Sequence, residues 1–268
     1  MDGDAHSRVT PLTRLFVIVS ACSADIIVNY PLWIYAKRIM AGLSRPRLGE
    51  IYKGAGSLLF SCGPMMTLQD HSTHFILQRL GDDKKAQNSH FFSACVSGAV
   101  GGLFVGAQVE SVITRAHAQR ETVWRTFQST YAKKGGLAAL ALPYGALMVA
   151  AREVPYAGTM FFLSHWIRTQ LNGGDELGAH VSTSHHIGRD LLTAFVSAAI
   201  VGPISHAPSV IASHQQANNV TISTACREMY AAGGFRSFYR GIIPRTITLA
   251  GSLFVIPITI AAVQPMLE

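Results

Sequence analysis

The segment Phe-Tyr-Arg-Gly-Ile-Ile-Pro-Arg at 238–245 leads into residues 246–267, which contain no Asp, Glu, Lys or Arg. A charge-free stretch of this length can cross a bilayer as a helix, because one crossing takes about 20 residues. Further charge-free stretches cover 86–109, 135–151 and 191–226. These stretches therefore predict a membrane protein with several apolar helices.

The overall composition supports this class. Of 268 residues, 49% are hydrophobic and 14% are charged, with a mean hydropathy of +0.27. A soluble domain usually carries about 25% charged residues. The four cysteines are far apart and form no Cys-x-x-Cys pair, so we expect neither a disulfide framework nor a metal site, and no cofactor. They are Cys22, Cys62, Cys95 and Cys226.

The net charge of +7 is distributed unevenly along the chain. Basic residues concentrate in the connections 37–53, 115–134 and 227–245, and the connections between them are close to neutral. Alternation of this kind is what the positive-inside rule produces in a multi-pass protein. It does not resemble the basic, aromatic face of a nucleic-acid binder, so nucleic acid is excluded as a partner.

Three glycines that follow or lie near a tyrosine mark an internal repeat. Gly54, Gly145 and Gly241 are separated by 91 and 96 residues, and a proline follows ten residues after the first two. In the apolar segment that precedes each of these glycines, a stretch of small residues leads to a proline or a similar helix break. We therefore divide the chain into repeats 1–86, 87–175 and 176–268. Helix kinks are expected at four prolines: Pro31, Pro64, Pro155 and Pro208.

These patterns resemble the mitochondrial carrier family along the whole chain. The strongest matches are Phe-Tyr-Arg-Gly at 238–241 with Pro244-Arg245, Ala-Arg-Glu-Val-Pro at 151–155, and Tyr-Pro-Leu at 30–32. The resemblance implies an all-α membrane protein with six transmembrane helices in three pseudo-symmetric repeats around a central cavity. It also implies short helices on the matrix surface, an inner-membrane location, and both termini on the intermembrane-space side.

The charge-free stretches and the family resemblance together predict the positions of the helices. The spans are expected at about 12–40, 54–80, 88–117, 137–169, 188–216 and 241–265, and surface helices within 48–53, 121–132 and 222–231. The expected partners are the lipid bilayer, with cardiolipin as a candidate at the matrix-side helix ends, and an inner-membrane protein complex. No nucleophile–base or metal constellation is visible, so we expect no enzymatic activity.

Carriers of this family close the matrix side of the cavity with a ring of ion pairs. Here the acid positions of that pattern are Trp33, Glu110 and Ser209, and the base positions are Ala36, Ile113 and Ala212. Glu110 has no partner within the pattern, so it pairs elsewhere or is protonated. Hydrophobic plugs such as Trp33 and Ile113 are one replacement for the ring.

The opposite gate shows the same loss. Its acid positions are His74, His165 and Ala261, and its base positions are Leu77, Arg168 and Gln264. Neither gate retains a complete ion pair within its pattern.

The family's cavity contact sites fall on Ser61, on Arg152 with Glu153, and on Thr248. The Arg-acid pair resembles carriers of amino acids and of S-adenosylmethionine, in which Arg152 would hold a carboxylate and Glu153 an ammonium. The alternative is an internal pair of Arg152 with Glu153 or Glu110. Asp25 is a further cavity candidate, or else pairs with Arg189 or Arg152.

Two functions follow from these features. Loss of both gates favours a non-transporting structural subunit of a larger inner-membrane complex, either respiratory or ATP synthase. The contact-site residues favour an active carrier that exchanges an amino acid or a related compound such as S-adenosylmethionine.

Overall fold

The computed structural model describes residues 11–80, 87–133, 142–171 and 187–266, and this part of the chain contains helices and no strand. The α-helices are α1 (Pro11–Met40), α2 (Ala55–Leu80), α3 (Gln87–Gly101), α4 (Ala107–Ala118), α5 (Val123–Lys133), α7 (Ala146–Gly158), α8 (Ser164–Leu171), α9 (Ile187–Asn218), α10 (Ile222–Gly233) and α11 (Ile242–Val263). Short 3-10 turns are η1 (Leu48–Glu50), η4 (Gly234–Tyr239) and η5 (Gln264–Met266). Two π-helical turns, η2 (Gly102–Gly106) and η3 (Thr159–Leu163), join α3 to α4 and α7 to α8.

A helical segment occupies each range predicted to cross the membrane. Four helical stretches are long and apolar enough to cross by length and composition: Leu15–Met40, Ser89–Ala118, Ile187–Asn218 and Ile242–Met266. The other two long segments, α2 and α7–α8, carry more polar residues, among them Gln69 and the Arg152–Glu153 pair. The all-helical class of the described chain agrees with the sequence-based prediction.

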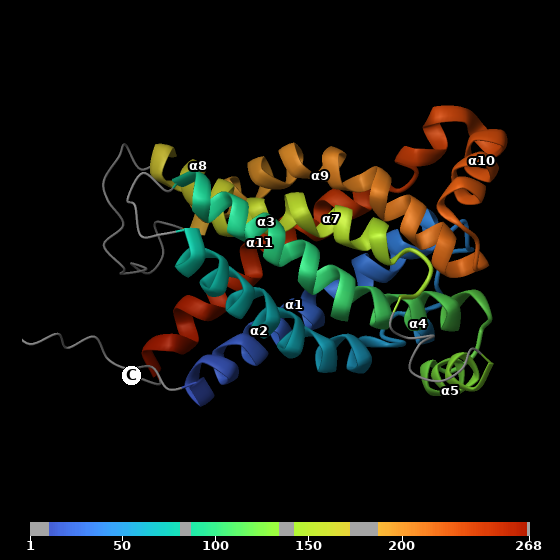
Figure 1. The fold of residues 1–268 in the computed structure, drawn as a ribbon, viewed down its shortest axis with the longest axis horizontal. Coiled ribbons are helices and arrows are strands. Elements are labelled where there is room, and N and C mark those ends of the chain that lie inside the picture. The colour runs from blue at the N-terminus through green and yellow to red at the C-terminus, as the bar shows by residue number, and fades with distance from the viewer. Residues whose placement is uncertain (1–10, 81–86, 134–141, 172–186, 267–268) are drawn as a thin grey trace, which may run out of the picture.

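The long helices form a closed ring. Each packs against the next in chain order: α1 on α2, α2 on α3, α3 on α7, α7 on α9, α9 on α11, and α11 back on α1. Figure 1 shows them side by side along the long axis of the molecule. At one end α1, α4 and α9 also contact one another, so the ring is closed across its centre there.

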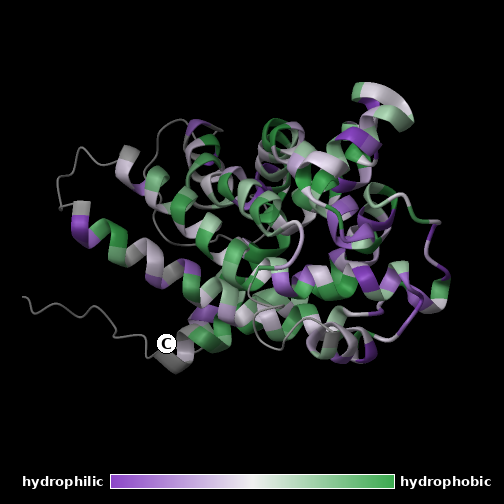
Figure 2. Ribbon diagram, turned by 45° about the vertical axis from the view of Figure 1, so that its right-hand side comes forward, coloured by the Kyte–Doolittle hydropathy of each residue, from purple (hydrophilic) through white to green (hydrophobic). Residues whose placement is uncertain are grey.

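The short helices lie at this closed end. In Figure 1, α5 and α10 lie at the end opposite the start of α1 and the finish of α11. The positions of η1, α5 and α10 agree with the three predicted surface helices. Figure 2 shows more hydrophilic residues toward this end and hydrophobic residues along the central helices. The basic connections therefore gather where the ring is closed.

The three repeat glycines share one backbone conformation. Gly54, Gly145 and Gly241 have φ of +95°, +89° and +82°, and each immediately precedes a helix of the ring. A residue with a side chain adopts this region only at a cost, so glycine is the residue that fits these turns. The four prolines at which kinks are predicted lie inside helices: Pro31, Pro64, Pro155 and Pro208.

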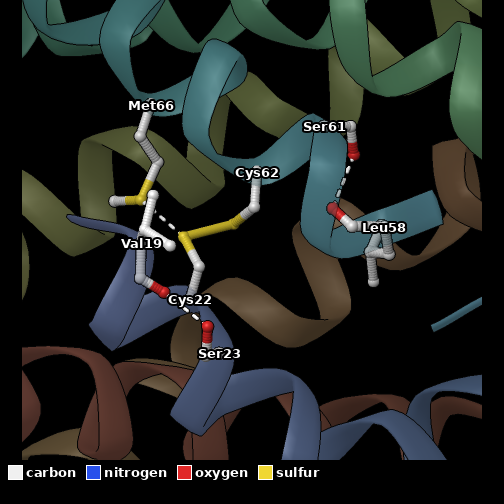
Figure 3. Close-up of a disulfide and its surroundings, with 7 residues drawn as sticks. All are labelled: Val19, Cys22, Ser23, Leu58, Ser61, Cys62 and Met66. Atoms are coloured by element: carbon white, nitrogen blue, oxygen red, sulfur yellow. Dashed lines mark hydrogen bonds between the residues drawn. A yellow bond between two sulfur atoms is a disulfide. The ribbon is translucent and has the colours of Figure 1, made fainter. Parts of the chain in front are cut away.

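One disulfide was not expected from the sequence. Cys22 on α1 is bonded to Cys62 on α2, as Figure 3 shows. Their Cα atoms are 6.2 Å apart. The two cysteines are 40 residues apart and meet because α1 and α2 pack side by side. Residue spacing alone does not reveal such a contact. Cys95 and Cys226 are free.

Candidate functional site

The centre of the ring holds a cavity of about 160 Å³. Small-molecule pockets usually have about 300–1,000 Å³, so this space is small. The cavity is lined by every contact residue that the sequence predicted: Asp25, Ser61, Arg152, Glu153 and Thr248. Helices α1, α2, α7 and α11 therefore bring these side chains together around one cavity.

A buried ion cluster closes the cavity at the end that carries α5 and α10. Lys37 Nζ lies 2.6 Å from Glu110 Oε2. Arg152 donates to both oxygens of Glu110, at 2.9 and 2.6 Å, and also pairs with Glu153. All four residues are at most 5% exposed. Glu110 is therefore paired, and Arg152 forms both of the internal pairs considered for it.

Lys37 corrects the interpretation of this gate. The carrier pattern places the base at Ala36, which is instead packed against Met40 and Val210. Lys37 is the next residue, and its long side chain reaches Glu110 from α1. An ion pair therefore joins α1 and α4, displaced by one residue from the family's pattern. The signal in the sequence was a lysine inside an apolar helix.

Helix α9 joins the cluster through a side-chain amide. Gln216 Oε1 on α9 accepts hydrogen bonds from Lys37 Nζ at 3.0 Å and from Thr114 Oγ1 at 3.1 Å. Gln216 is fully buried. The cluster thus connects α1, α4 and α9, and the sequence analysis missed Lys37, Thr114 and Gln216.

Apolar packing fills the other ring positions. Ile113 is fully buried against Tyr30 and Ile34, with Trp33 partly buried beside them. Ala212 packs against Val149, and Ser209 donates to the carbonyl of its own helix at Ser205. Trp33 and Ile113, the residues proposed as a hydrophobic plug, thus belong to one apolar cluster.

At the opposite end, Arg168 is the one residue among the described gate positions that forms an ion pair. Arg168 on α8 pairs with Asp190 on α9 at 2.8 Å, although the pattern predicted no acid there. Asp190 lies in the first turn of α9, outside the pattern, and α8 and α9 are neighbours. This pair therefore joins adjacent helices and does not cross the cavity mouth.

The remaining positions of that gate are less constrained. Leu77 and Ala261 are half-buried and Gln264 is exposed. The side chains of His74 and His165 lie outside the described part of the structure.

The polar groups of four contact residues have partners within the protein. Ser61 donates to the carbonyl of Leu58, and Thr248 donates to that of Pro244. Asp25 accepts from Asn29 at 2.7 Å, and Arg152 is occupied by Glu110 and Glu153. The Asp25 carboxylate is therefore hydrogen-bonded within α1, and Arg152, one of the two arginines considered as its partner, pairs with Glu110 and Glu153 instead.

Two buried polar atoms of cavity-lining residues have no hydrogen-bond partner within the described chain. They are Glu153 Oε2 and Arg245 Nε. The Glu153 oxygen is a hydrogen-bond acceptor on an acidic residue, and the Arg245 nitrogen is a donor on a basic residue. Arg245 belongs to the Pro-Arg of the opening motif, and the sequence analysis did not assign it to the cavity.

A further polar group stabilises the chain just beyond α1. Arg38 pairs with Glu50 at 3.2 Å and donates to the carbonyl of Ser44. The backbone N–H of Arg47 is bonded to the Glu50 carboxylate and holds its pKa below the usual range. This group fixes the connection between α1 and α2 at the closed end.

Comparison with known proteins agrees with this architecture. The chain is 23% identical over 258 residues to the mitochondrial RNA-splicing protein MRS3 of Saccharomyces cerevisiae (strain ATCC 204508 / S288c), covering 90% of this chain and 78% of that protein. MRS3 is a mitochondrial carrier family member. This similarity supports the interpretation of the chain as a divergent member of the same family.

No family model matches the sequence of this chain. The sequence departs from the family's matrix-side ion-pair pattern, because Ala36, Ile113 and Ala212 occupy the positions of its bases. A search for the family's usual ion pairs at their usual spacing misses the Lys37–Glu110 pair that replaces them.

Proposed function

We propose that this carrier is a non-transporting structural subunit of a larger inner-membrane complex, either respiratory or ATP synthase. The observation that carries the proposal is the state of Arg152. The guanidinium of Arg152 is ion-paired with both Glu110 and Glu153. The cluster that they form also closes one end of the cavity. A solute that needed Arg152 would have to break the buried cluster first.

The two ends of the cavity also differ in how they are closed. Alternating access requires two closed states of similar free energy, each held by contacts absent from the other. A bias of about 5.5 kcal/mol already separates populations of 99:1 and 1:99. The α5/α10 end has the buried cluster, whereas the described residues of the other gate provide only the pair between neighbouring helices. This asymmetry favours a single closed conformation.

A second candidate is an active carrier for an amino acid or a related compound such as S-adenosylmethionine. The observation that favours it is the pair of unpartnered atoms, Glu153 Oε2 and Arg245 Nε, on residues that line the cavity. Together they would complement a small zwitterion, with the ammonium at Glu153 and the carboxylate at Arg245. The small cavity volume weighs against this candidate.

The proposed arrangement in the membrane has six spans in three repeats, with the basic connections in the matrix and both termini in the intermembrane space. The shared conformation of Gly54, Gly145 and Gly241 supports the repeats. The basic connections at the closed end support the orientation. The proposed partners besides the complex are bilayer lipids, with cardiolipin as a candidate at the matrix-side helix ends, and we expect no enzymatic activity.

Cysteine labelling tests this orientation. Arg45 is exposed at the closed end, and Met266 is 81% exposed at the opposite end. In a Cys95→Ser/Cys226→Ser background, we expect Met266→Cys to react with a membrane-impermeant maleimide in intact mitoplasts and Arg45→Cys to react only after the membrane is opened. Labelling of Arg45→Cys from outside would contradict the orientation. Lys84, which the sequence places on the same side as Met266, lies outside the described residues.

Purification of the native protein in mild detergent tests the structural role. We expect this carrier to co-migrate in a fixed molar ratio with one respiratory or ATP synthase complex, and to remain with it through a second separation by charge. Its removal should lower the amount of the assembled complex. Recovery as a free monomer, with the complexes unchanged in its absence, would contradict the proposal.

A further inference from the structure

Three sulfur atoms meet in the wall of the cavity. Cys22 Sγ lies 3.3 Å from Met66 Sδ and is bonded to Cys62 Sγ, and Figure 3 shows all three side chains converging between α1 and α2. Cys22 is 1% exposed, and Cys62 and Met66 line the cavity. The group is thus enclosed by helices and is approached from the cavity.

Two thiolates and a thioether form a soft ligand set. Soft sulfur ligands select Cu(I), whereas carboxylate and carbonyl oxygens suit Mg²⁺, Ca²⁺ and Mn²⁺. Zn²⁺ in structural sites is almost always four-coordinate, with thiolate, imidazole or carboxylate ligands. The nearby carboxylate of Asp25 is hydrogen-bonded to Asn29. We propose that Cys22, Cys62 and Met66, in the reduced form of the chain, bind one Cu(I) ion.

The helix framework suits a three-coordinate site. Metal–sulfur bonds of about 2.3 Å place the three sulfurs of a trigonal site about 4 Å apart. The Cα atoms of Cys22 and Cys62 are 6.2 Å apart, so side-chain rotation of the reduced cysteines opens the sulfur pair to this spacing. Met66 is one helical turn after Cys62 on α2, so both ligands project from the same face of that helix.

Metal binding and the disulfide exclude each other. A dithiol reductant breaks the Cys22–Cys62 bond by transferring two electrons and two protons, and is itself oxidised to a disulfide. Binding of Cu(I) then releases the two thiol protons to solvent as the thiolates coordinate the metal. The site is therefore present in the reduced chain and absent from the oxidised chain. This inference depends only on the packing of α1 against α2, and is independent of whether the protein transports a solute.

Copper titration of the full-length purified protein in detergent tests the proposal. The chain is reduced anaerobically with dithiothreitol, the reductant is removed, and Cu(I) is added in the presence of the competing chelator bathocuproine disulfonate. We expect one Cu(I) per reduced chain and none per oxidised chain. Failure of the reduced chain to compete for Cu(I) would overturn the proposal.

Matched variants identify the ligands. We expect Cys22→Ser and Cys62→Ser to lose the bound copper, and Met66→Leu to weaken binding about tenfold or more. Cys95→Ser and Cys226→Ser are the controls and should bind as the wild type does, since both cysteines are outside the cluster. Unchanged binding by Cys22→Ser, or loss in the two controls, would contradict the assignment.

X-ray absorption at the copper edge provides a readout that does not depend on variants. A shell of three sulfurs is expected in the reduced wild-type protein. A shell of nitrogen and oxygen alone would overturn the proposal, and circular dichroism on each variant shows that helix content is retained.

Discussion

Replacing Glu110 by Gln is expected to lower the free energy of unfolding by about 3–5 kcal/mol. Glu110 is the anion between Lys37 and Arg152, and all three side chains are buried. The amide keeps the shape of the carboxylate and removes its charge, which leaves two buried cations with Glu153 as the remaining anion of the cluster. Thermal unfolding of the purified protein in detergent, followed by circular dichroism, measures the change.

The matched control for this substitution is Glu121→Gln. Glu121 pairs with Arg125 at 3.7 Å, and the Arg125 side chain is 76% exposed. A pair of this kind contributes about 0–1 kcal/mol. Adding Lys37→Met to Glu110→Gln removes one of the uncompensated cations and should restore part of the loss. Equal effects of Glu110→Gln and Glu121→Gln would show that the buried cluster does not stabilise the closed end.

Gly98→Ala is expected to destabilise the fold by about 1–3 kcal/mol through overpacking. A Cβ atom at Gly98 would lie 2.6 Å from Ala157 Cβ and 2.7 Å from the backbone oxygen of Glu153. Neither atom belongs to a flexible side-chain end, so α3 and α7 must separate to accept the methyl group. Because Glu153 follows Arg152 on α7, the substitution should also loosen the ion cluster. Thermal unfolding under the same conditions measures the loss.

Gly56→Ala is the control for that substitution. Gly56 lies in α2 with no other atom within 4 Å of the added Cβ, so the change should be neutral or stabilise the helix by about 0.5–1 kcal/mol. Similar unfolding temperatures for Gly98→Ala and Gly56→Ala would contradict the close approach of α3 and α7.

The helices and turns could be predicted because their signals are local. Charge-free stretches mark apolar helices, and the three glycines occupy turns that a side chain would strain. All of the predicted contact residues line one cavity. Their positions follow from residue spacing within each helix, which decides the helix face on which a side chain lies.

The cluster and the disulfide could not be predicted because they depend on contacts between distant segments. Lys37 reaches Glu110 across 73 residues and Gln216 across 179. The family's motif specifies a base at position 36 only. The side chain of Lys37 is long enough to reach Glu110 from the next position on the helix. The meeting of Cys22 with Cys62 likewise required the packing of α1 on α2.

Solute exchange by the purified protein in liposomes measures most directly whether coupled transport has been lost. Wild type and Arg152→Ala are reconstituted in parallel, and uptake of amino acids, S-adenosylmethionine and carboxylates is followed, with circular dichroism showing that both are folded. We expect no saturable uptake above that of protein-free liposomes for either protein, because Arg152 is held in the buried cluster. Saturable uptake by the wild type that Arg152→Ala abolishes would contradict the structural role and identify Arg152 as the substrate anchor.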